Sequence, residues 1–179
     1  MSRTRTLAVD TSHFDNVYLF DQRLALACTK KKEGMCGAFS NIFILSALSK
    51  KPLEEFKKPD YCELNSKASQ LESRAIDHFR DGEDADAIAF HEMNLSTQTK
   101  VISADKTADT LKQSSAALLK YQTPTGDYHQ LGFSRLFQKC VAHNPNQLTG
   151  VAECDLIYHY LQTVITNNHA ENIKVDFIL

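Results

Sequence analysis

The chain has 179 residues, with 20 Lys and Arg against 22 Asp and Glu, so its formal charge is −2 at pH 7. That balance gives no overall electrostatic attraction to nucleic acid or to an anionic membrane surface, and we expect neither as a partner. Hydrophobic residues make up 42% of the sequence and charged residues 23%, which is typical of a folded protein of ordinary composition. At this length we expect a single domain over residues 1–179.

The apolar runs, such as Ile42 to Leu45, are far shorter than the roughly 20 residues that a membrane-spanning helix needs. The first residues are basic, but Asp10 arrives before any apolar segment of a secretory signal has formed. The sequence therefore predicts neither a signal peptide nor a transmembrane segment.

The five cysteines are an odd number and form no CxxC pair. This pattern favours reduced thiols in a cytosolic compartment over a framework of disulfides. Their spacing to histidines does not match that of known zinc modules, and His91-Glu92 does not extend to HExxH because Leu95 takes the place of the second His. We expect no metal and no other cofactor.

In the N-terminal half, apolar clusters within residues 7–26 fit either a strand or a helix. Residues 35–48 are apolar on nearly every side and predict a helix buried in the core, ended by Pro52. A helical face is predicted within 68–79, and a weaker helix over 84–95.

The C-terminal half changes to a pattern of strands and turns, apart from two helices. Ser103 is placed to cap a short helix that runs to about Lys112. The further expected elements are a strand over 116–122, a turn over 123–127, an apolar extended stretch over 128–142 with a break or bend near its middle, a turn over 144–146, a helix over 153–166 and a strand over 173–179.

Cys36 has an unusual place, at the first turn of the most hydrophobic helix. Glycines lie near it on both sides, at Gly34 and Gly37, where they allow a sharp turn and leave room for a substrate backbone. The unpaired N–H groups and positive dipole end of a helix start favour a thiolate, the nucleophilic form of cysteine. A cysteine at a buried helix start is equally often just a small hydrophobic residue.

A nucleophilic thiol needs a base, and the base needs a group that fixes its orientation. His129 begins a predicted strand, and Asn144 lies in the turn Asn-Pro-Asn that ends the next run. If the two runs are antiparallel neighbours, the Asn144 side-chain oxygen can accept the imidazole N–H. His143 and Asp155 remain alternative orienting groups.

These motifs occur in the order of a papain-like site, and the chain resembles the YopT/AvrPphB family of bacterial effector cysteine proteases. The resemblance rests on three short stretches: GMCGAFS at 34–40, HQLGF at 129–133 and NPN at 144–146. Where the family has an aspartate, this chain has Asn144, so the implied triad is Cys36, His129 and Asn144. The amide that the family uses in its oxyanion hole has no match just before Cys36, and Gln22 is our candidate for that role.

The resemblance implies an α+β papain-like fold in which an N-terminal buried helix carries Cys36 and packs on a C-terminal antiparallel sheet. It also implies a secreted effector that acts on a host protein in the host cytoplasm. Proteolysis, glutamine deamidation and transglutamination all pass through the same thioester, so the last two remain alternatives to the first. A third alternative is a non-enzymatic helical interaction module.

Overall fold

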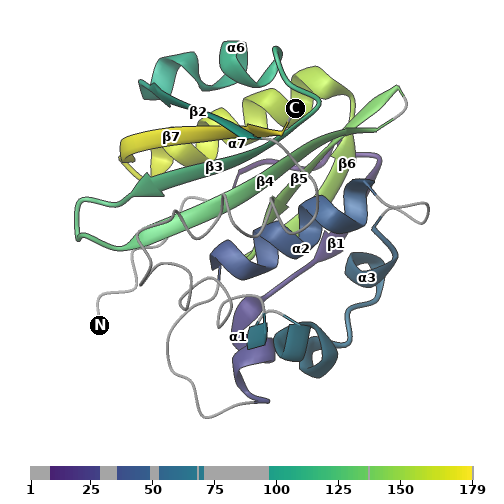
Figure 1. Ribbon diagram of the computed structural model, residues 1–179. Coiled ribbons are helices and arrows are strands. Elements are labelled where there is room, and N and C mark those ends of the chain that lie inside the picture. Colours follow the sequence, from purple (N-terminus) through teal and green to yellow (C-terminus); the bar gives the residue numbers. More distant parts are fainter. Residues whose placement is uncertain are drawn as a thin grey trace.

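The computed structural model describes residues 9–28, 36–48, 53–67, 69–70, 97–136 and 138–178. They form one antiparallel sheet with helices on both faces (Figure 1), which confirms the α+β prediction. The sheet has seven strands in the order β1-β6-β5-β4-β3-β7-β2. Their bounds are β1 Asn16–Leu19, β2 Thr97–Ile102, β3 Ala116–Gln122, β4 Tyr128–Leu136, β5 Lys139–Asn144, β6 Leu148–Ala152 and β7 Glu171–Ile178.

The centre of the sheet is made of strands joined by short turns. The stretch over 128–142, for which the sequence predicts a break or bend near the middle, is a hairpin of β4 and β5, because Gln138 adopts a left-handed conformation with φ 62° and reverses the chain. A second tight turn over Asn144–Gln147 leads into β6 and is closed by a hydrogen bond from the Gln147 N–H to the Asn144 carbonyl.

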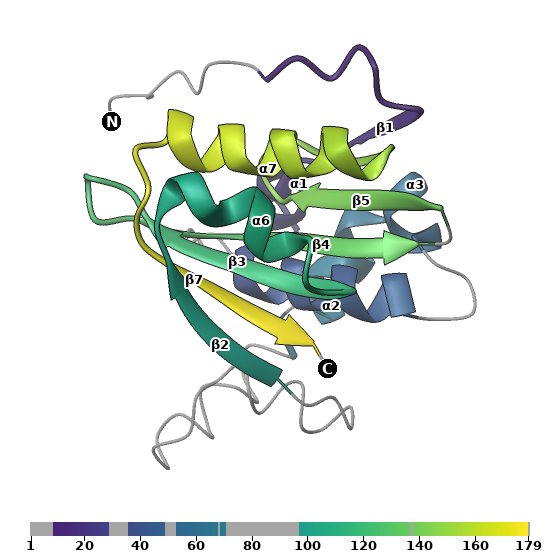
Figure 2. The same ribbon diagram turned by 90° about the horizontal axis from the view of Figure 1, so that it is seen from above.

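One face of the sheet is covered by α7 (Cys154–Asn167), with η1 (Ala104–Lys106) and α6 (Thr107–Leu111) beside it (Figure 2). Leu119, Leu131 and Phe133 of the sheet share a buried apolar cluster with Ile157 and Leu161 of α7. Burial of such side chains is the main source of stability, at about 25 cal/mol per Å² of apolar surface.

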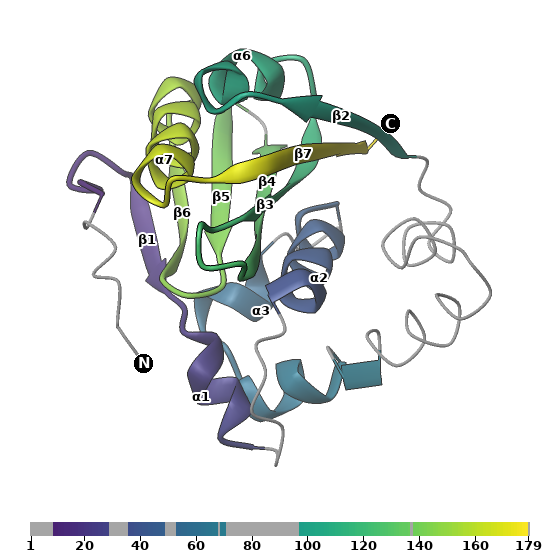
Figure 3. The same cartoon turned by 90° about the vertical axis from the view of Figure 1, so that its left-hand side faces the viewer.

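The opposite face carries α2 (Cys36–Leu48) and α3 (Glu54–Lys57), and α1 (Gln22–Leu26) lies beyond them (Figure 3). Phe39, Phe43 and Ile44 of α2 are buried, as its apolar sequence predicts, and share a core with Leu118 of β3. α2 packs closely on β4: a Cβ on Gly132 would overlap Cδ1 of Phe43. Gly132 is therefore the residue that lets helix and sheet approach.

Other predictions had mixed outcomes. The C-terminal helix and strand are present within two residues of the predicted bounds. Ser103 does not cap the following helix, because its hydroxyl donates to the Asp105 carboxylate instead, at 2.6 Å. The predicted helices over 68–79 and 84–95 lie outside the described residues, except for 69–70. Within the described ranges, no helix is both long and apolar enough to cross a membrane.

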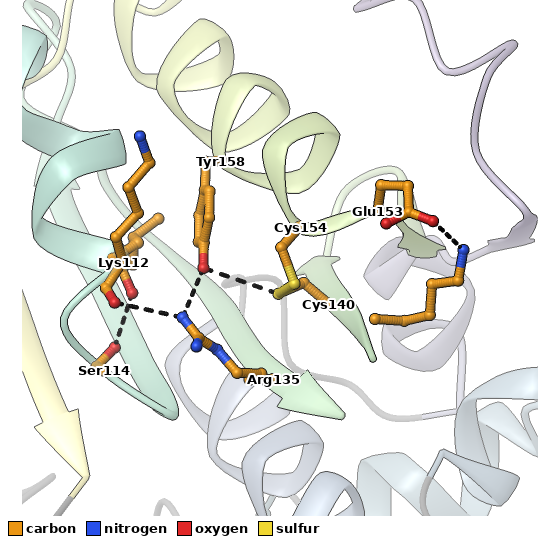
Figure 4. Close-up of a disulfide and its surroundings, with 9 residues drawn as sticks. Lys112, Ser114, Arg135, Cys140, Glu153, Cys154 and Tyr158 are labelled. Carbon is orange, nitrogen blue, oxygen red and sulfur yellow. Dashed lines mark hydrogen bonds and ion pairs between the residues drawn. A yellow bond between two sulfur atoms is a disulfide. The ribbon is translucent and has the colours of Figure 1, made fainter. Parts of the chain in front are cut away.

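The expectation of reduced thiols is wrong for four of the five cysteines. Cys28 is bonded to Cys62, and Cys140 to Cys154. Each pair joins residues brought together only by the fold, 34 and 14 positions apart, so no short sequence motif signals them. The Cys140–Cys154 bond ties β5 to the start of α7, and the Tyr158 hydroxyl lies between this disulfide and Arg135 (Figure 4).

Candidate active site

Several segments that carry the candidate residues end or begin at one end of the sheet. β1 pairs with β6 so that Leu19 lies opposite Leu148, and the chain continues from there to Gln22. β4 begins at this end with Tyr128 and His129, and β5 ends here at Asn144. The antiparallel order of the strands thus brings segments that are far apart in the sequence to the same end of the sheet.

The contacts of α2 with β4 show how this helix runs along the strand. The Ser40 hydroxyl donates to the carbonyl of Gln130 at 3.2 Å, and Phe43 lies against Gly132. Moving toward the start of α2 therefore means moving toward the start of β4. Cys36 is the first residue of α2, one helical turn before Ser40, so its backbone lies toward the end of β4 that carries His129.

His129 and Asn144 are joined by a hydrogen bond, with 3.1 Å between Nε2 of the ring and Oδ1 of the amide. The same Oδ1 also accepts the backbone N–H of Asn146 at 3.1 Å, which identifies it as the oxygen of the carboxamide. Since an oxygen only accepts, Nε2 of His129 must carry the hydrogen. The lone pair of the neutral ring is then on Nδ1, which is the tautomer a base requires.

The surroundings of His129 favour its neutral form. Burial lowers the pKa of His129, while the hydrogen bond to Asn144 acts in the opposite direction by stabilising the imidazolium. The ring also packs edge-to-face on Tyr121, with centroids 5.6 Å apart. A neutral imidazole that can gain a proton with the help of its partner is suited to general base catalysis.

Gln22 is buried beside the Asn-Pro-Asn turn. Its backbone N–H donates to the Pro145 carbonyl at 2.8 Å, and its side-chain Nε2 donates to Oδ1 of Asn146. These two contacts orient the Gln22 carboxamide at the same end of the sheet as His129. The residues are 124 positions apart, which explains why no local pattern in the sequence signals the contact.

The two alternative orienting groups are placed elsewhere. His143 lies among Phe20, Phe43 and Phe56, and its Nδ1 is 2.8 Å from the Thr149 hydroxyl. Asp155 is in the first turn of α7, which follows the far end of β6. Asn144 is therefore the one of the three candidates that is hydrogen-bonded to His129.

Sequence reasoning gave no role to Tyr160 of α7, which is buried behind the same turn and donates to Oε1 of Gln147 at 2.9 Å. Tyr160 is part of the apolar face of an amphipathic helix, and nothing in its spacing separates it from ordinary core residues. In the parts of the chain that are described, no group of three His, Cys, Asp or Glu side chains is arranged to hold a metal ion.

No protein-family model matches this chain, and no curated protein matches it either. Its structure, however, is similar to the crystal structure of the Pseudomonas avirulence protein AvrPphB, with a TM-score of 0.64 and 14% identity over 80% of this chain and 90% of that one. The fold is that of a papain-like effector protease.

A second similar structure is PatoxP, a cysteine protease-like domain of the Photorhabdus asymbiotica toxin PaTox. The TM-score is 0.60 with 12% identity, over 93% of this chain and 54% of that chain. At such low identity the two similarities establish the fold, while the roles of individual residues rest on the geometry described above.

Proposed function

We propose that the protein is a cysteine protease of bacterial effector type that uses Cys36 as nucleophile, His129 as general base and acid, and Asn144 to orient His129. The observation that carries the proposal is the hydrogen bond between His129 and Asn144. Because the Asn146 N–H identifies the Asn144 atom in this bond as the oxygen, the hydrogen of the His129 ring is on Nε2. This leaves the basic nitrogen of the ring on the side away from Asn144, where a thiol is required.

The pairing of the cysteines supports the same role for Cys36. Four of the five cysteines are bonded to one another, so Cys36 is the one that has no cysteine left within the chain to pair with. It begins a helix of 13 residues, where the N-terminal end of the helix dipole stabilises a thiolate.

In the proposed reaction, His129 accepts the thiol proton and the Cys36 sulfur attacks the carbonyl carbon of the scissile peptide bond. The tetrahedral intermediate collapses to a thioester as His129 gives the proton to the leaving amine. Water then attacks the thioester carbonyl while His129 takes one of its protons. The carboxylic acid is released, and the proton returns to the Cys36 sulfur.

The developing oxyanion needs hydrogen-bond donors placed in advance. We assign one to the backbone N–H of Cys36 and the other to the side-chain amide of Gln22. The contacts of Gln22 with Pro145 and Asn146 support this assignment, because they fix its carboxamide against the turn that follows Asn144.

The substrate class is inferred from the neighbours: an avirulence protein and a toxin domain are both directed at host organisms. We propose a host protein as substrate and the host cytoplasm as the site of action. A helical interaction module does not fit the observed fold, since the described residues build a seven-stranded sheet.

The decisive experiment is alkylation by iodoacetamide at pH 6 without reductant, followed by peptide mass spectrometry. Cys36 is expected to take up one equivalent, and His129→Ala is expected to slow the reaction about tenfold, because an unpaired thiol has a pKa of about 8.5. His159→Ala, on the exposed side of α7, is the matched control and should react like the natural chain. A Cys36 rate that is indifferent to His129 would contradict the proposal.

The bond that is broken is identified by the intact mass of candidate host proteins after incubation. Proteolysis splits a chain into fragments, whereas deamidation adds about one dalton and transglutamination adds the mass of the amine less that of the ammonia released. Cys36→Ser is expected to abolish the change. Deamidation without fragments would replace the peptidase assignment and leave the triad in place.

A further inference from the structure

A row of polar side chains leads away from the candidate active site across the sheet. Gln130, which directly follows the candidate base in β4, lies opposite Lys120 of β3, and Lys120 lies opposite Lys174 of β7 (Figure 2). All three side chains are on the α2 face of the sheet, because the neighbouring Leu131 and Val175 belong to the core under α7 and successive residues of a strand alternate. We call these three residues the polar row.

The polar row emerges from under α2 into solvent. Ser40 of α2 donates its hydroxyl to the Gln130 carbonyl, and Gln130 is 6% exposed. The Lys120 side chain is 22% exposed, and Lys174 is fully on the surface. Beyond them, Val101 of β2 lies opposite Lys174 and is 69% exposed. The row therefore leads from the candidate catalytic residues to an open part of the sheet.

The polar row has more positive charge and more hydrogen-bond donors than its surroundings balance. Nζ of Lys120 lies 2.6 Å from Oδ2 of Asp176, whose other oxygen accepts the Thr99 hydroxyl at 2.7 Å. Within the described residues, Lys174 forms no ion pair, and Nε2 of Gln130 is buried without an acceptor. Like charges directly opposite each other on neighbouring strands lower stability, as does a buried donor without an acceptor. The pairing of Lys120 with Lys174 therefore needs a reason other than stability.

A substrate bound at the candidate site reaches the polar row within a few residues. Neighbouring strands are about 4.8 Å apart, so the backbone at Lys174 lies about 10 Å from the backbone at Gln130. An extended peptide advances about 3.3 Å per residue, so three residues cover this distance. A carboxylate on such a residue would accept from the Lys174 ammonium and balance the charge that Asp176 leaves unbalanced.

We propose that the polar row is a specificity subsite that binds an acidic side chain, aspartate or glutamate, within three residues of the scissile bond of the protein substrate. Lys174 forms the ion pair with that carboxylate. Lys120, held in place by Asp176, adds a second positive charge beside it. The inference rests on the proposed function and deepens it, since it names the chemical type of sequence that is cleaved.

The test is the cleavage of a library of chymotryptic peptides from a host proteome, with the cut sites read by mass spectrometry. Such peptides keep acidic and basic residues in their interior. For the natural chain, aspartate and glutamate together are expected to be enriched about fivefold at one position within three residues of the cut, as one exposed ion pair can provide. Lys174→Gln should abolish this enrichment, and Lys174→Glu should replace it with an enrichment of lysine and arginine.

Lys100→Glu is the matched control. Lys100 is also an exposed lysine of β2, but it lies opposite Val175 and so on the other face of the sheet. This variant should keep the acidic enrichment. Thermal unfolding separates a loss of specificity from a loss of fold. Lys174→Glu is expected to unfold at a temperature no lower than the natural chain, because it replaces a like-charge pair across two strands with an opposite-charge pair.

The inference is overturned if the natural chain cuts the library without acidic enrichment, if Lys174→Gln keeps that enrichment, or if Lys100→Glu changes it as strongly. Failure of the proposed function has a different signature. The natural chain would then cut no peptide, or Cys36→Ser would cut as the natural chain does, and the subsite would fall with the protease assignment.

Discussion

The side-chain oxygen of Asn144 accepts two hydrogen bonds, so the behaviour of His129 depends on whether an amide or a carboxylate stands at position 144. Oδ1 receives Nε2–H of His129 and the backbone N–H of Asn146, both at 3.1 Å. The effector family that the chain resembles has an aspartate here. A carboxylate offers the same oxygen and adds a charge that stabilises the imidazolium more strongly than a neutral amide does.

We therefore expect Asn144→Asp to raise the pKa of His129 and to keep or increase the alkylation rate of Cys36 at pH 6. Asn144→Ala should lower that rate about fivefold, less than His129→Ala does, because the ring stays but loses its acceptor. The rates are measured by peptide mass spectrometry. If Asn144→Ala has no effect while His143→Ala or Asp155→Ala slows Cys36, the assignment of the third residue is wrong.

Substitution of Gln22 distinguishes an effect on turnover from an effect on the reactivity of the Cys36 thiol. Removal of one oxyanion donor typically lowers turnover about 10²-fold or more, yet it leaves the thiolate untouched. Gln22→Ala is thus expected to lower kcat strongly on a verified protein substrate while Cys36 alkylates at nearly the natural rate. Arg23→Ala, which removes the exposed neighbour paired with Asp21, is the control and should leave kcat unchanged. Equal turnover in both variants would place the donor elsewhere.

At the scale of elements, the contact of α2 with β4 sets where the nucleophile lies. Phe43 occupies the space that any side chain at position 132 would fill. Gly132→Ala should therefore displace α2 and lower the free energy of unfolding by about 1–3 kcal/mol, as overpacked cores do. Chemical denaturation measures the loss, and alkylation of Cys36 reports the displacement.

The matched variant for this prediction is Gly132→Ala combined with Phe43→Leu, which gives the new methyl group room. The double variant should be more stable than the sum of the single losses implies. Strict additivity would show that the ring and the glycine do not compete for the same space.

The elements that the sequence predicted are those whose apolar pattern lies entirely within the element itself. The uninterrupted apolar run of α2 and the amphipathic face of α7 are properties of the helices themselves. β6 and β2 were missed, because β6 is short and follows a turn directly, and β2 is a polar edge strand whose alternation carries little apolar signal. Their places depend on pairing with β5 and β7, which no local pattern encodes.

The candidate site likewise has some contacts that follow from local sequence patterns and others that depend on distant elements. His129 and Asn144 lie on strands that a tight hairpin joins, so their contact follows from the order of turns. The position of Gln22 against Asn146 and of Tyr160 against Gln147 depends on packing between distant elements. The disulfides belong to this second class as well, since neither pair is close in sequence.

At the scale of the whole molecule, stability is coupled to pH through the buried histidines. Desolvation lowers the pKa of His143 to about 3, with the nearby His129 acting in the same direction, and the pKa of His129 is lowered too. An unfolded histidine has a pKa of about 6.5, so below that pH the unfolded state binds protons that the folded state does not. The stabilisation is complete above pH 6.5 and is lost as the pH falls toward 3.

We expect the free energy of unfolding to fall between pH 6 and pH 4, with His143 contributing a slope of up to about 1.4 kcal/mol per pH unit. His143→Gln should remove that part of the slope while lowering stability at pH 7, where the natural ring packs among three phenylalanines. Urea denaturation at several pH values measures both. Parallel curves for the two proteins would mean that His143 takes up protons equally in the folded and unfolded states.

The two disulfides close two covalent loops, and each loop contains one residue of the proposed triad. The Cys28–Cys62 loop contains Cys36, the Cys140–Cys154 loop contains Asn144, and His129 lies outside both. When the chain unfolds, the thiolate of Cys36 meets four bonded sulfurs at high local concentration and attacks them as readily as an added thiol does. The residue proposed to make the folded enzyme active thus also makes its denatured state prone to mispaired isomers. Cys36→Ser is expected to refold more completely from urea without reductant.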